Sequence, residues 1–198
     1  MGHATPRVAA LLAAGGGIRF SGGDDDRPHK LLALLHGRPV WEWSLEHLLD
    51  AGFDHVVIVT GALELPIPPS DRVIAVRNPL WRNGQAGSVG LAVHAAGELG
   101  ARAVTVGLAD QPFVTSADWQ AVADAPPEAR LVLADYDDGT GPNPVRLHID
   151  VWPLLPADGD TGARDVIRGH PEWVFTVRCV GSGADIDTLE DLERWNNC

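Results

Sequence analysis

The sequence predicts an α/β fold whose central sheet is mostly parallel. Short apolar runs alternate along the chain with stretches of helical periodicity, a pattern that is typical of repeated βαβ units. The chain has 198 residues, of which 45% are hydrophobic, so it can bury one continuous core. We therefore expect a single domain over residues 1–198.

The apolar runs predict six strands, which in chain order are Val8–Ala13, His55–Thr60, Val73–Val76, Ala103–Leu108, Leu131–Asp135 and Trp173–Arg178. Five helices are expected to alternate with them, at Pro39–Ala51, Ser88–Leu99, Ala117–Ala123, Ala163–Gly169 and Leu189–Asn196. Pro39 suits a first helical turn because it lacks a backbone N–H, and Gly52 follows the apolar stripe where that helix would end. Thr188, with Asp191 three residues later, is typical of a helix N-cap.

Composition and charge exclude several classes of function. A net charge of −12 argues against a DNA- or RNA-binding surface, and no apolar run reaches the roughly eighteen residues of a membrane span. The segment Met1–Pro6 is too short and polar for a signal peptide. Cys179 and Cys198 have no Cys or His neighbour at metal-ligand spacing, and His148 with Asp150 is better explained as a surface pair than as a zinc site. These features favour a cytoplasmic protein.

A glycine-rich loop follows the first predicted strand. The run Leu12–Arg19 contains three consecutive glycines, and Lys30, the single lysine of the chain, comes soon after it. Glycines allow backbone N–H groups to approach phosphates closely, and the side chains of Arg19 and Lys30 can neutralise phosphate charge. The loop therefore predicts nucleotide binding. The alternative is that an arginine-rich composition left one lysine by chance on a solvated loop.

Two acidic residues stand where a metal site is expected. Ligands of open α/β sheets bind beyond the carboxyl ends of the strands. Asp110 lies two residues after the end of the predicted strand Ala103–Leu108. Asp187 precedes the last helix. Mg²⁺ often takes one or two protein carboxylates and fills its remaining positions with water and phosphate oxygens. Capping of a turn or a helix is the alternative role for each carboxylate.

Other motifs that bind nucleotides or activate serine are absent from the sequence. Phe20 occupies the position of the third glycine in the pattern G-x-G-x-x-G, and no glycine precedes Lys30 as a P-loop requires. Ala86 replaces the first glycine of a nucleophile elbow around Ser88. The sequence therefore favours neither a dinucleotide-binding enzyme nor a serine hydrolase.

Five blocks in fixed order carry a family resemblance, namely Leu12–Arg19 with Lys30, Asn78–Trp81, Gly84–Ser88, Asp110–Pro112 and Asp185–Leu192. They resemble the nucleotidyltransferases of molybdenum cofactor biosynthesis, the cytidylyltransferases more closely than the molybdopterin-guanine dinucleotide synthases. The resemblance spans nearly the whole chain. It implies a Rossmann-like nucleotide-diphospho-sugar transferase fold, which is a three-layer α/β/α architecture with a mostly parallel sheet.

The resemblance also implies an activity and its residues. The reaction would transfer CMP from CTP to the terminal phosphate of molybdopterin and release pyrophosphate. Residues expected to bind the nucleotide are Leu12, Ala13, Ala14, Gly15, Gly17, Gly84 and Ser88. Lys30 and Arg19 are the expected catalytic cations, and Asp110 and Asp187 match the ligands of Mg²⁺ or Mn²⁺. In this family L-A-A-G tends to accompany CTP and L-A-G-G tends to accompany GTP, so Ala14 favours CTP.

Several alternatives stay open. GTP could replace CTP, or the same fold could serve another phosphorylated acceptor. A non-catalytic nucleotide-binding protein is the alternative of a different class, in which the acidic insertion Asp24–Asp26 opposes the triphosphate. The Trp81 ring could contact a base or pterin ring of a ligand, or it could only pack against other side chains of the protein. Asp160 and Arg164 lie in a stretch that either contacts substrate or forms a polar loop.

Overall fold

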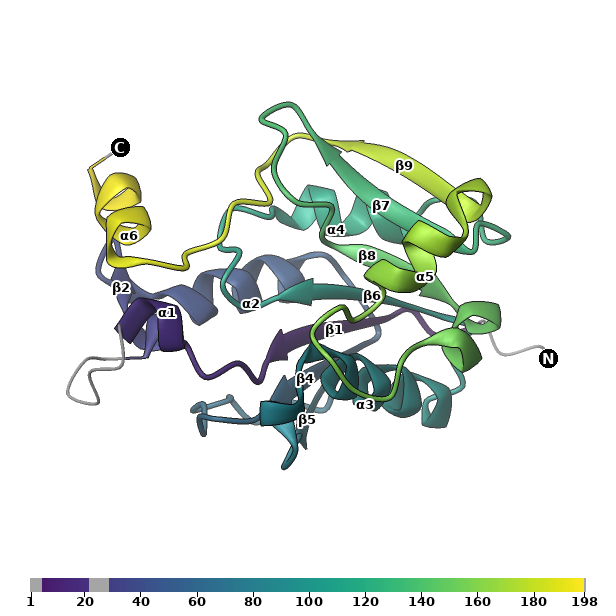
Figure 1. The fold of residues 1–198 in the computed structure, drawn as a ribbon, viewed down its shortest axis with the longest axis horizontal. Coiled ribbons are helices and arrows are strands. Elements are labelled where there is room, and N and C mark those ends of the chain that lie inside the picture. Colours follow the sequence, from purple (N-terminus) through teal and green to yellow (C-terminus); the bar gives the residue numbers. More distant parts are fainter. Residues whose placement is uncertain (1–4, 22–28, 198) are drawn as a thin grey trace.

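The computed structural model describes residues 5–21 and 29–197, and within these ranges a seven-stranded sheet forms the centre of the molecule (Figure 1). The strand order across the sheet is β5-β4-β1-β6-β8-β7-β9. The strands are β1 (Val8–Ala13), β4 (His55–Thr60), β5 (Val73–Arg77), β6 (Ala103–Leu108), β7 (Leu131–Tyr136), β8 (Val145–His148) and β9 (Val174–Cys179). All six strands expected from the sequence are present, with ends that differ by at most one residue.

The four strands β5, β4, β1 and β6 run parallel to one another. Every residue of β1 is buried, as expected for a strand with neighbours on both sides and helices on both faces. β1 pairs in register with β4, so that Val8 lies opposite His55 and Ala13 opposite Thr60. The carboxyl ends of these strands therefore meet at one edge of the sheet, and the chain segments that follow them lie together there.

The structure adds a strand that the sequence did not predict. β8 lies between β6 and β7 and runs antiparallel to both, so the sheet is mostly, not wholly, parallel. β8 contains Arg146, whose buried guanidinium donates hydrogen bonds to the backbone carbonyls of Ala123 and Ala125 at 3.0 and 2.7 Å. A buried arginine in a four-residue strand breaks the apolar pattern by which strands are recognised. The two-residue strands β2 (Leu34–Leu35) and β3 (Arg38–Pro39) form a separate small hairpin that was not predicted either.

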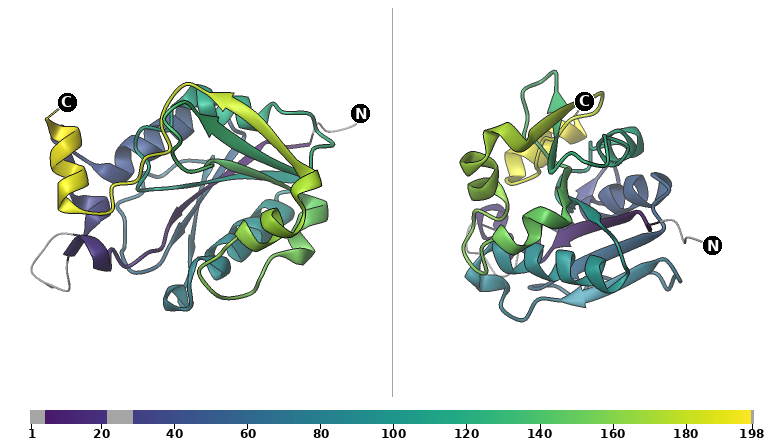
Figure 2. Two further views of the ribbon diagram at one scale, coloured as in Figure 1. Left: turned by 45° about the horizontal axis from the view of Figure 1, so that its top comes forward. Right: turned by 90° about the vertical axis from the view of Figure 1, so that its right-hand side faces the viewer.

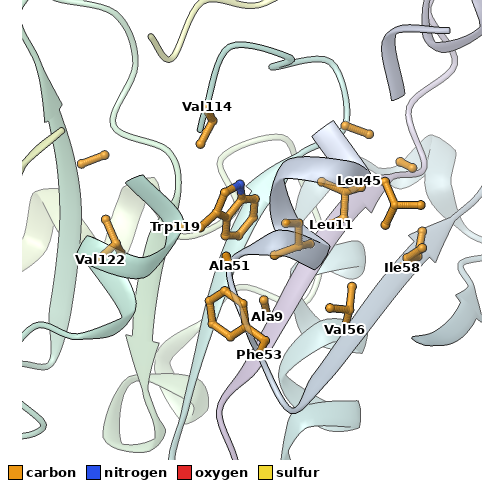
Figure 3. Close-up of a cluster of buried hydrophobic side chains, with 14 of the residues drawn as sticks. Ala9, Leu11, Leu45, Ala51, Phe53, Val56, Ile58, Val114, Trp119 and Val122 are labelled. Atoms are coloured by element: carbon orange, nitrogen blue, oxygen red, sulfur yellow. The ribbon is translucent and has the colours of Figure 1, made fainter. Parts of the chain in front are cut away.

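Helices cover both faces of the sheet. α2 (Val40–Asp50) and α4 (Ser116–Ala123) pack on one face, whereas α3 (Gln85–Glu98) and α5 (Arg164–Gly169) pack on the other (Figure 1). In the core beneath α2 and α4, the rings of Trp119 and Phe53 meet edge to face with 6.3 Å between centroids (Figure 3). This three-layer α/β/α arrangement is the architecture expected from the sequence. Within the described ranges, no helix has both the length and the apolar character that crossing a membrane requires.

The elements at the carboxyl edge come from the two ends of the chain. α1 (Ile18–Ser21), β2 and α6 (Leu189–Asn196) lie together at one end of the molecule in both Figure 1 and Figure 2. α6 begins with the predicted cap, in which Thr188 and Asp191 each bond the other's backbone N–H. The prediction that Pro39 opens the first helical turn is wrong, because its ψ of 137° is extended and Val40 begins α2 instead.

Candidate active site

A cleft of about 830 Å³ opens at the carboxyl edge of the parallel strands. The eleven residues expected to act on a nucleotide come from five separate segments of the chain, and all of them line this cleft. They are Leu12, Ala13, Ala14, Gly15, Gly17, Arg19, Lys30, Gly84, Ser88, Asp110 and Asp187. The acidic insertion Asp24–Asp26 lies outside the described residues.

The glycine loop is held between two aromatic side chains. The Nε2 of His29 donates to the carbonyl of Gly15 at 2.8 Å, and a Cβ on Gly17, where φ is +63°, would lie 3.0 Å from that ring nitrogen. A Cβ on Gly16 would lie 2.8 Å from the ring of Trp81. A side chain at Gly16 would therefore force the Trp81 ring to move, and one at Gly17 would be strained by the positive φ. The absence of side chains leaves the backbone of the loop open to a ligand in the cleft.

Lys30 lies between the two predicted metal-binding acids. Its Nζ is 2.5 Å from Oδ2 of Asp110 and 2.7 Å from Oδ1 of Asp187. The other oxygen of Asp187 accepts from Arg19 at 2.9 Å. Burial opposes the charge of the Lys30 ammonium, but Asp110 and then Asp187 outweigh burial, so the pKa of Lys30 is raised. The lysine is therefore a fixed cation at neutral pH.

Backbone contacts fix the positions of the two acids. The N–H of Ala109 donates to the carbonyl of Leu12 at 3.0 Å, which continues the pairing of β6 with β1 up to Asp110. The carbonyl of Asp110 accepts from Ile186 at 2.9 Å, so the segments that carry Asp110 and Asp187 are joined directly. The two carboxylates therefore face each other because β6 and the segment before α6 end at the same edge.

The donor set fits a divalent cation accompanied by phosphates. One oxygen from Asp110 and one from Asp187 lie within 2.7 Å of the Lys30 Nζ, so the two carboxylates converge on one cation, which in this structure is the Lys30 ammonium. Across residues 5–21 and 29–197, no cluster of three or more His, Cys, Asp or Glu side chains could hold a metal ion. Two carboxylates, with water and phosphate oxygens for the remaining positions, are a common arrangement for Mg²⁺.

The opposite wall of the cleft is built by the start of α3. Gly84 has a φ of +104°, and a Cβ there would lie 2.3 Å from the carbonyl of Gly159. The Gly159 carbonyl accepts from the N–H of Ala86 at 2.9 Å and so caps the first turn of α3. Ser88 is buried, and its hydroxyl accepts from Nδ2 of Asn78 at 2.9 Å. Gly84 is thus required for close backbone contact, whereas Ser88 is tied to a second side chain.

The cleft contains functional candidates that the sequence did not single out. His29 donates a hydrogen bond to the glycine loop. Its position next to Lys30 in the sequence is the feature that could have pointed to it. Asp185 lines the cleft two residues before Asp187, at the spacing that places side chains on one side of an extended segment. Burial, and secondly the charge of Asp110, raises the pKa of the Asp185 carboxyl to about 6. His148 and Asp150 lie 3.3 Å apart and do not line the cleft; Asp150 is exposed, but the His148 side chain is only 14% exposed.

The fold and the cleft together define a class of protein. Cations beside a glycine loop suit a triphosphate, and strand-end acids suit the metal that accompanies it. These features are those of the α/β nucleotidyltransferases. Within this class, the model of the MobA-like NTP transferase domain matches residues 9–174, and the chain belongs to this family. The family and the fold expected from the sequence are thereby confirmed.

Solved structures share the fold along the whole chain. Rv0371c from Mycobacterium tuberculosis H37Rv is 24% identical with a TM-score of 0.80, and the match covers 99% of this chain and 100% of that one. A nucleotidyl transferase from Methanothermobacter is 21% identical with a TM-score of 0.77, covering 98% and 97%. The inositol-1-phosphate CTP transferase from T. maritima is 15% identical with a TM-score of 0.69, covering 98% and 96%.

A curated relative matches a shorter segment. The bifunctional protein GlmU from Zymomonas mobilis is 42% identical over 57 residues, which are 29% of this chain and 12% of GlmU. This chain therefore corresponds to a small part of that protein. The match identifies neither a reaction nor an acceptor for this chain.

Proposed function

We propose that the protein transfers CMP from CTP to the terminal phosphate of molybdopterin, with release of pyrophosphate and with Mg²⁺ or Mn²⁺ as the metal. The observation that carries the proposal is the position of Lys30, which lies between Asp110 and Asp187 in the same cleft as the glycine loop. A structure of the related mycobacterial protein, 25% identical with a TM-score of 0.76 over 99% of this chain and 100% of that one, is described as a complex with manganese. Use of a divalent metal by this family is consistent with the two carboxylates.

The proposed reaction is in-line attack by an acceptor phosphate oxygen on the α-phosphorus of the nucleotide. The nucleophile is already anionic, so no strong protein base is required. Lys30 and Arg19 would neutralise the charge that develops on the leaving pyrophosphate, and the loop amides near Gly15 and Gly17 would orient the triphosphate. A divalent ion held by Asp110 and Asp187 would supply further positive charge to the phosphates.

The choice of CTP over GTP rests on Ala14. Together with Leu12 and Ala13 it lines the cleft directly after β1, where the base and ribose would bind. Its methyl group packs against Gly61, since a Cβ on Gly61 would lie 2.9 Å from the Ala14 Cβ. The pattern L-A-A-G accompanies CTP in the cytidylyltransferases that the sequence resembles, and this supports the CTP assignment.

A different phosphorylated acceptor is the second candidate. The observation in its favour is the fold shared with an inositol-1-phosphate CTP transferase over 98% of this chain. The nucleotide site and the fold do not determine the acceptor. Screening phosphorylated acceptors with CTP separates this candidate from the first.

We further propose that residues 1–198 act as one nucleotidyltransferase domain in the cytoplasm. Segments as far apart in the sequence as Leu12 and Asp187 line a single cleft, which supports one domain.

Pyrophosphate release by the purified protein tests the proposal, with Mg²⁺ and molybdopterin present and with CTP compared against GTP. Release with CTP that is lost in Lys30→Ala is the expected result. A preference for GTP would keep the class of reaction and overturn the inference from Ala14. Nucleotide binding without any pyrophosphate release, across a screen of acceptors, would favour a binding protein in which Asp24–Asp26 oppose catalysis.

A further inference from the structure

Two arginines on the α3 side of the cleft have no carboxylate partner among the described residues. Arg82 and Arg164 both line the cleft, and both are exposed. Arg82 lies over the ring of Trp81, and no described carboxylate pairs with either guanidinium. By contrast, the cations of the facing wall are already paired, since Lys30 and Arg19 contact Asp110 and Asp187. In a chain with a net charge of −12, two cations in one cleft that no described carboxylate neutralises favour an anionic ligand.

Close contacts hold the two arginines on the same wall. Arg82 precedes Gly84 by two residues, and Gly84 touches the backbone of Gly159. The N–H of Gly159 donates to the carbonyl of Asn83 at 2.8 Å, which joins the segment before α3 to the segment before α5. Arg164, the first residue of α5, lies at the other end of that second segment. The wall is therefore a defined surface and not two independent loops.

Trp81 connects Arg82 to the glycine loop. The Arg82 guanidinium carbon is 4.4 Å from the centroid of the Trp81 ring, and the same ring occupies the space that a side chain on Gly16 would need. An anion bound by Arg82 would thus lie next to the loop that is proposed to hold the triphosphate. That position suits the nucleophile of an attack on the α-phosphorus.

We propose that Arg82 and Arg164 form the subsite for the phosphate group of the acceptor. The inference rests on the proposed nucleotidyl transfer and assigns only the phosphate of the second substrate to Arg82 and Arg164, whereas Gly84 and Ser88 on the same wall stay with the nucleotide. A phosphate monoester is the ligand class, because guanidinium groups bind its oxygens in pairs and tolerate its double charge. Asp160 lies on the same wall, but one of its carboxylate oxygens is 2.7 Å from where a Cβ on Gly84 would be, so the carboxylate faces Gly84.

Inorganic phosphate is the probe that tests this subsite without knowledge of the acceptor. The protein is saturated with Mg²⁺ and a CTP analogue that carries a methylene bridge between the α- and β-phosphates, and phosphate is titrated by calorimetry. We expect phosphate to bind this complex, and Arg82→Met or Arg164→Met to weaken it by about tenfold each, as for loss of one charge-assisted contact. Affinity for the CTP analogue should change less than about twofold.

Arg102→Met is the matched control, since Arg102 is an exposed arginine directly before β6, at the amino end of the strand and therefore at the opposite edge of the sheet from the cleft. It should bind phosphate and the CTP analogue as the wild type does. Unchanged phosphate affinity in both cleft variants would overturn the proposal, and so would an equal loss of affinity for the analogue, which would place the arginines at the triphosphate. If the wild type failed to bind the analogue, the nucleotide assignment would fall, whereas titration of phosphate into the free proteins would still decide the role of the arginines.

Discussion

Replacing Lys30 by methionine should lower both the melting temperature and the turnover. Addition of Mg²⁺ should restore part of the melting temperature but not the turnover. Lys30→Met shortens the side chain by one heavy atom, the ammonium nitrogen, and so removes the charge that lies between Asp110 and Asp187. The Lys30 side chain is only 13% exposed and that of Asp110 is 16% exposed, so two carboxylates would be left facing each other with little solvent. Their repulsion is the cost of the substitution.

The size of this cost follows from the contacts that remain. Breaking a buried ion pair costs about 3–5 kcal/mol. Here Asp187 keeps its contact with Arg19 at 2.9 Å, and each carboxylate keeps some solvent contact, so we expect about 2 kcal/mol. At roughly 2–4 °C per kcal/mol for a domain of this size, the melting temperature should fall by roughly 4–8 °C.

Differential scanning calorimetry with and without Mg²⁺ checks this prediction. Because the vacated position faces two carboxylates, millimolar Mg²⁺ should raise the melting temperature of Lys30→Met by more than it raises that of the wild type. With Mg²⁺ present, the turnover of Lys30→Met should still be on the order of 10²-fold lower than that of the wild type, because a cation that neutralises the phosphates is missing. The reasoning is refuted if the variant melts at the wild-type temperature, or if Mg²⁺ stabilises both proteins equally.

Three further predictions concern other parts of the cleft and the core. Asp110→Asn should lower turnover on the order of 10²-fold and keep the fold, as measured by pyrophosphate release and circular dichroism. Gly84→Ala should lower the melting temperature, because the new Cβ would lie 2.3 Å from a backbone carbonyl at a φ of +104°. Burial, with a further contribution from the charge of a nearby aspartate, raises the pKa of the Cys179 thiol to about 11, so at a pH of about 8 iodoacetamide should modify this residue only after unfolding.

Each of these three has a control or a contradicting result. Full turnover in Asp110→Asn would remove this residue from the proposed chemistry. Gly90→Ala is the matched control for Gly84→Ala, because Gly90 lies inside α3 with open space where a methyl group would be added, and it should be neutral or stabilising by up to about 1 kcal/mol. For Cys179, mass spectrometry of Cys198→Ser isolates the buried thiol, and rapid labelling of the folded protein would contradict the raised pKa.

The parts of the fold that the sequence predicted are those with continuous apolar patterns. β1, β4 and β6 are buried strands of six residues, and their predicted bounds agree with the structure. β8 could not be recognised in the same way, because it has four residues and places the buried Arg146 in the sheet. Its order in the sheet depends on pairing with β6 and β7, which are separate segments of the sequence.

The glycine loop and Asp110 were predicted from the rule that ligands bind at the carboxyl ends of parallel strands, whereas Gly84 and Ser88 were predicted from the family resemblance. That rule brought Asp110 and the glycine loop to one edge, and the structure places them there. The contacts of Lys30 could not be predicted, because its partners lie 80 and 157 residues away. The close approach of Gly84 to Gly159 is a contact between backbones, and such contacts have no side-chain signature in the sequence.

The fate of the α-phosphate tests the central claim most directly. The protein is incubated with Mg²⁺, molybdopterin and CTP that carries a label on either the α- or the γ-phosphate. Transfer of the α-label to the acceptor, with the γ-label recovered in pyrophosphate, is the result that nucleotidyl transfer at this cleft predicts. Appearance of the γ-label on the acceptor, or in inorganic phosphate with the α-label retained in CDP, would contradict it.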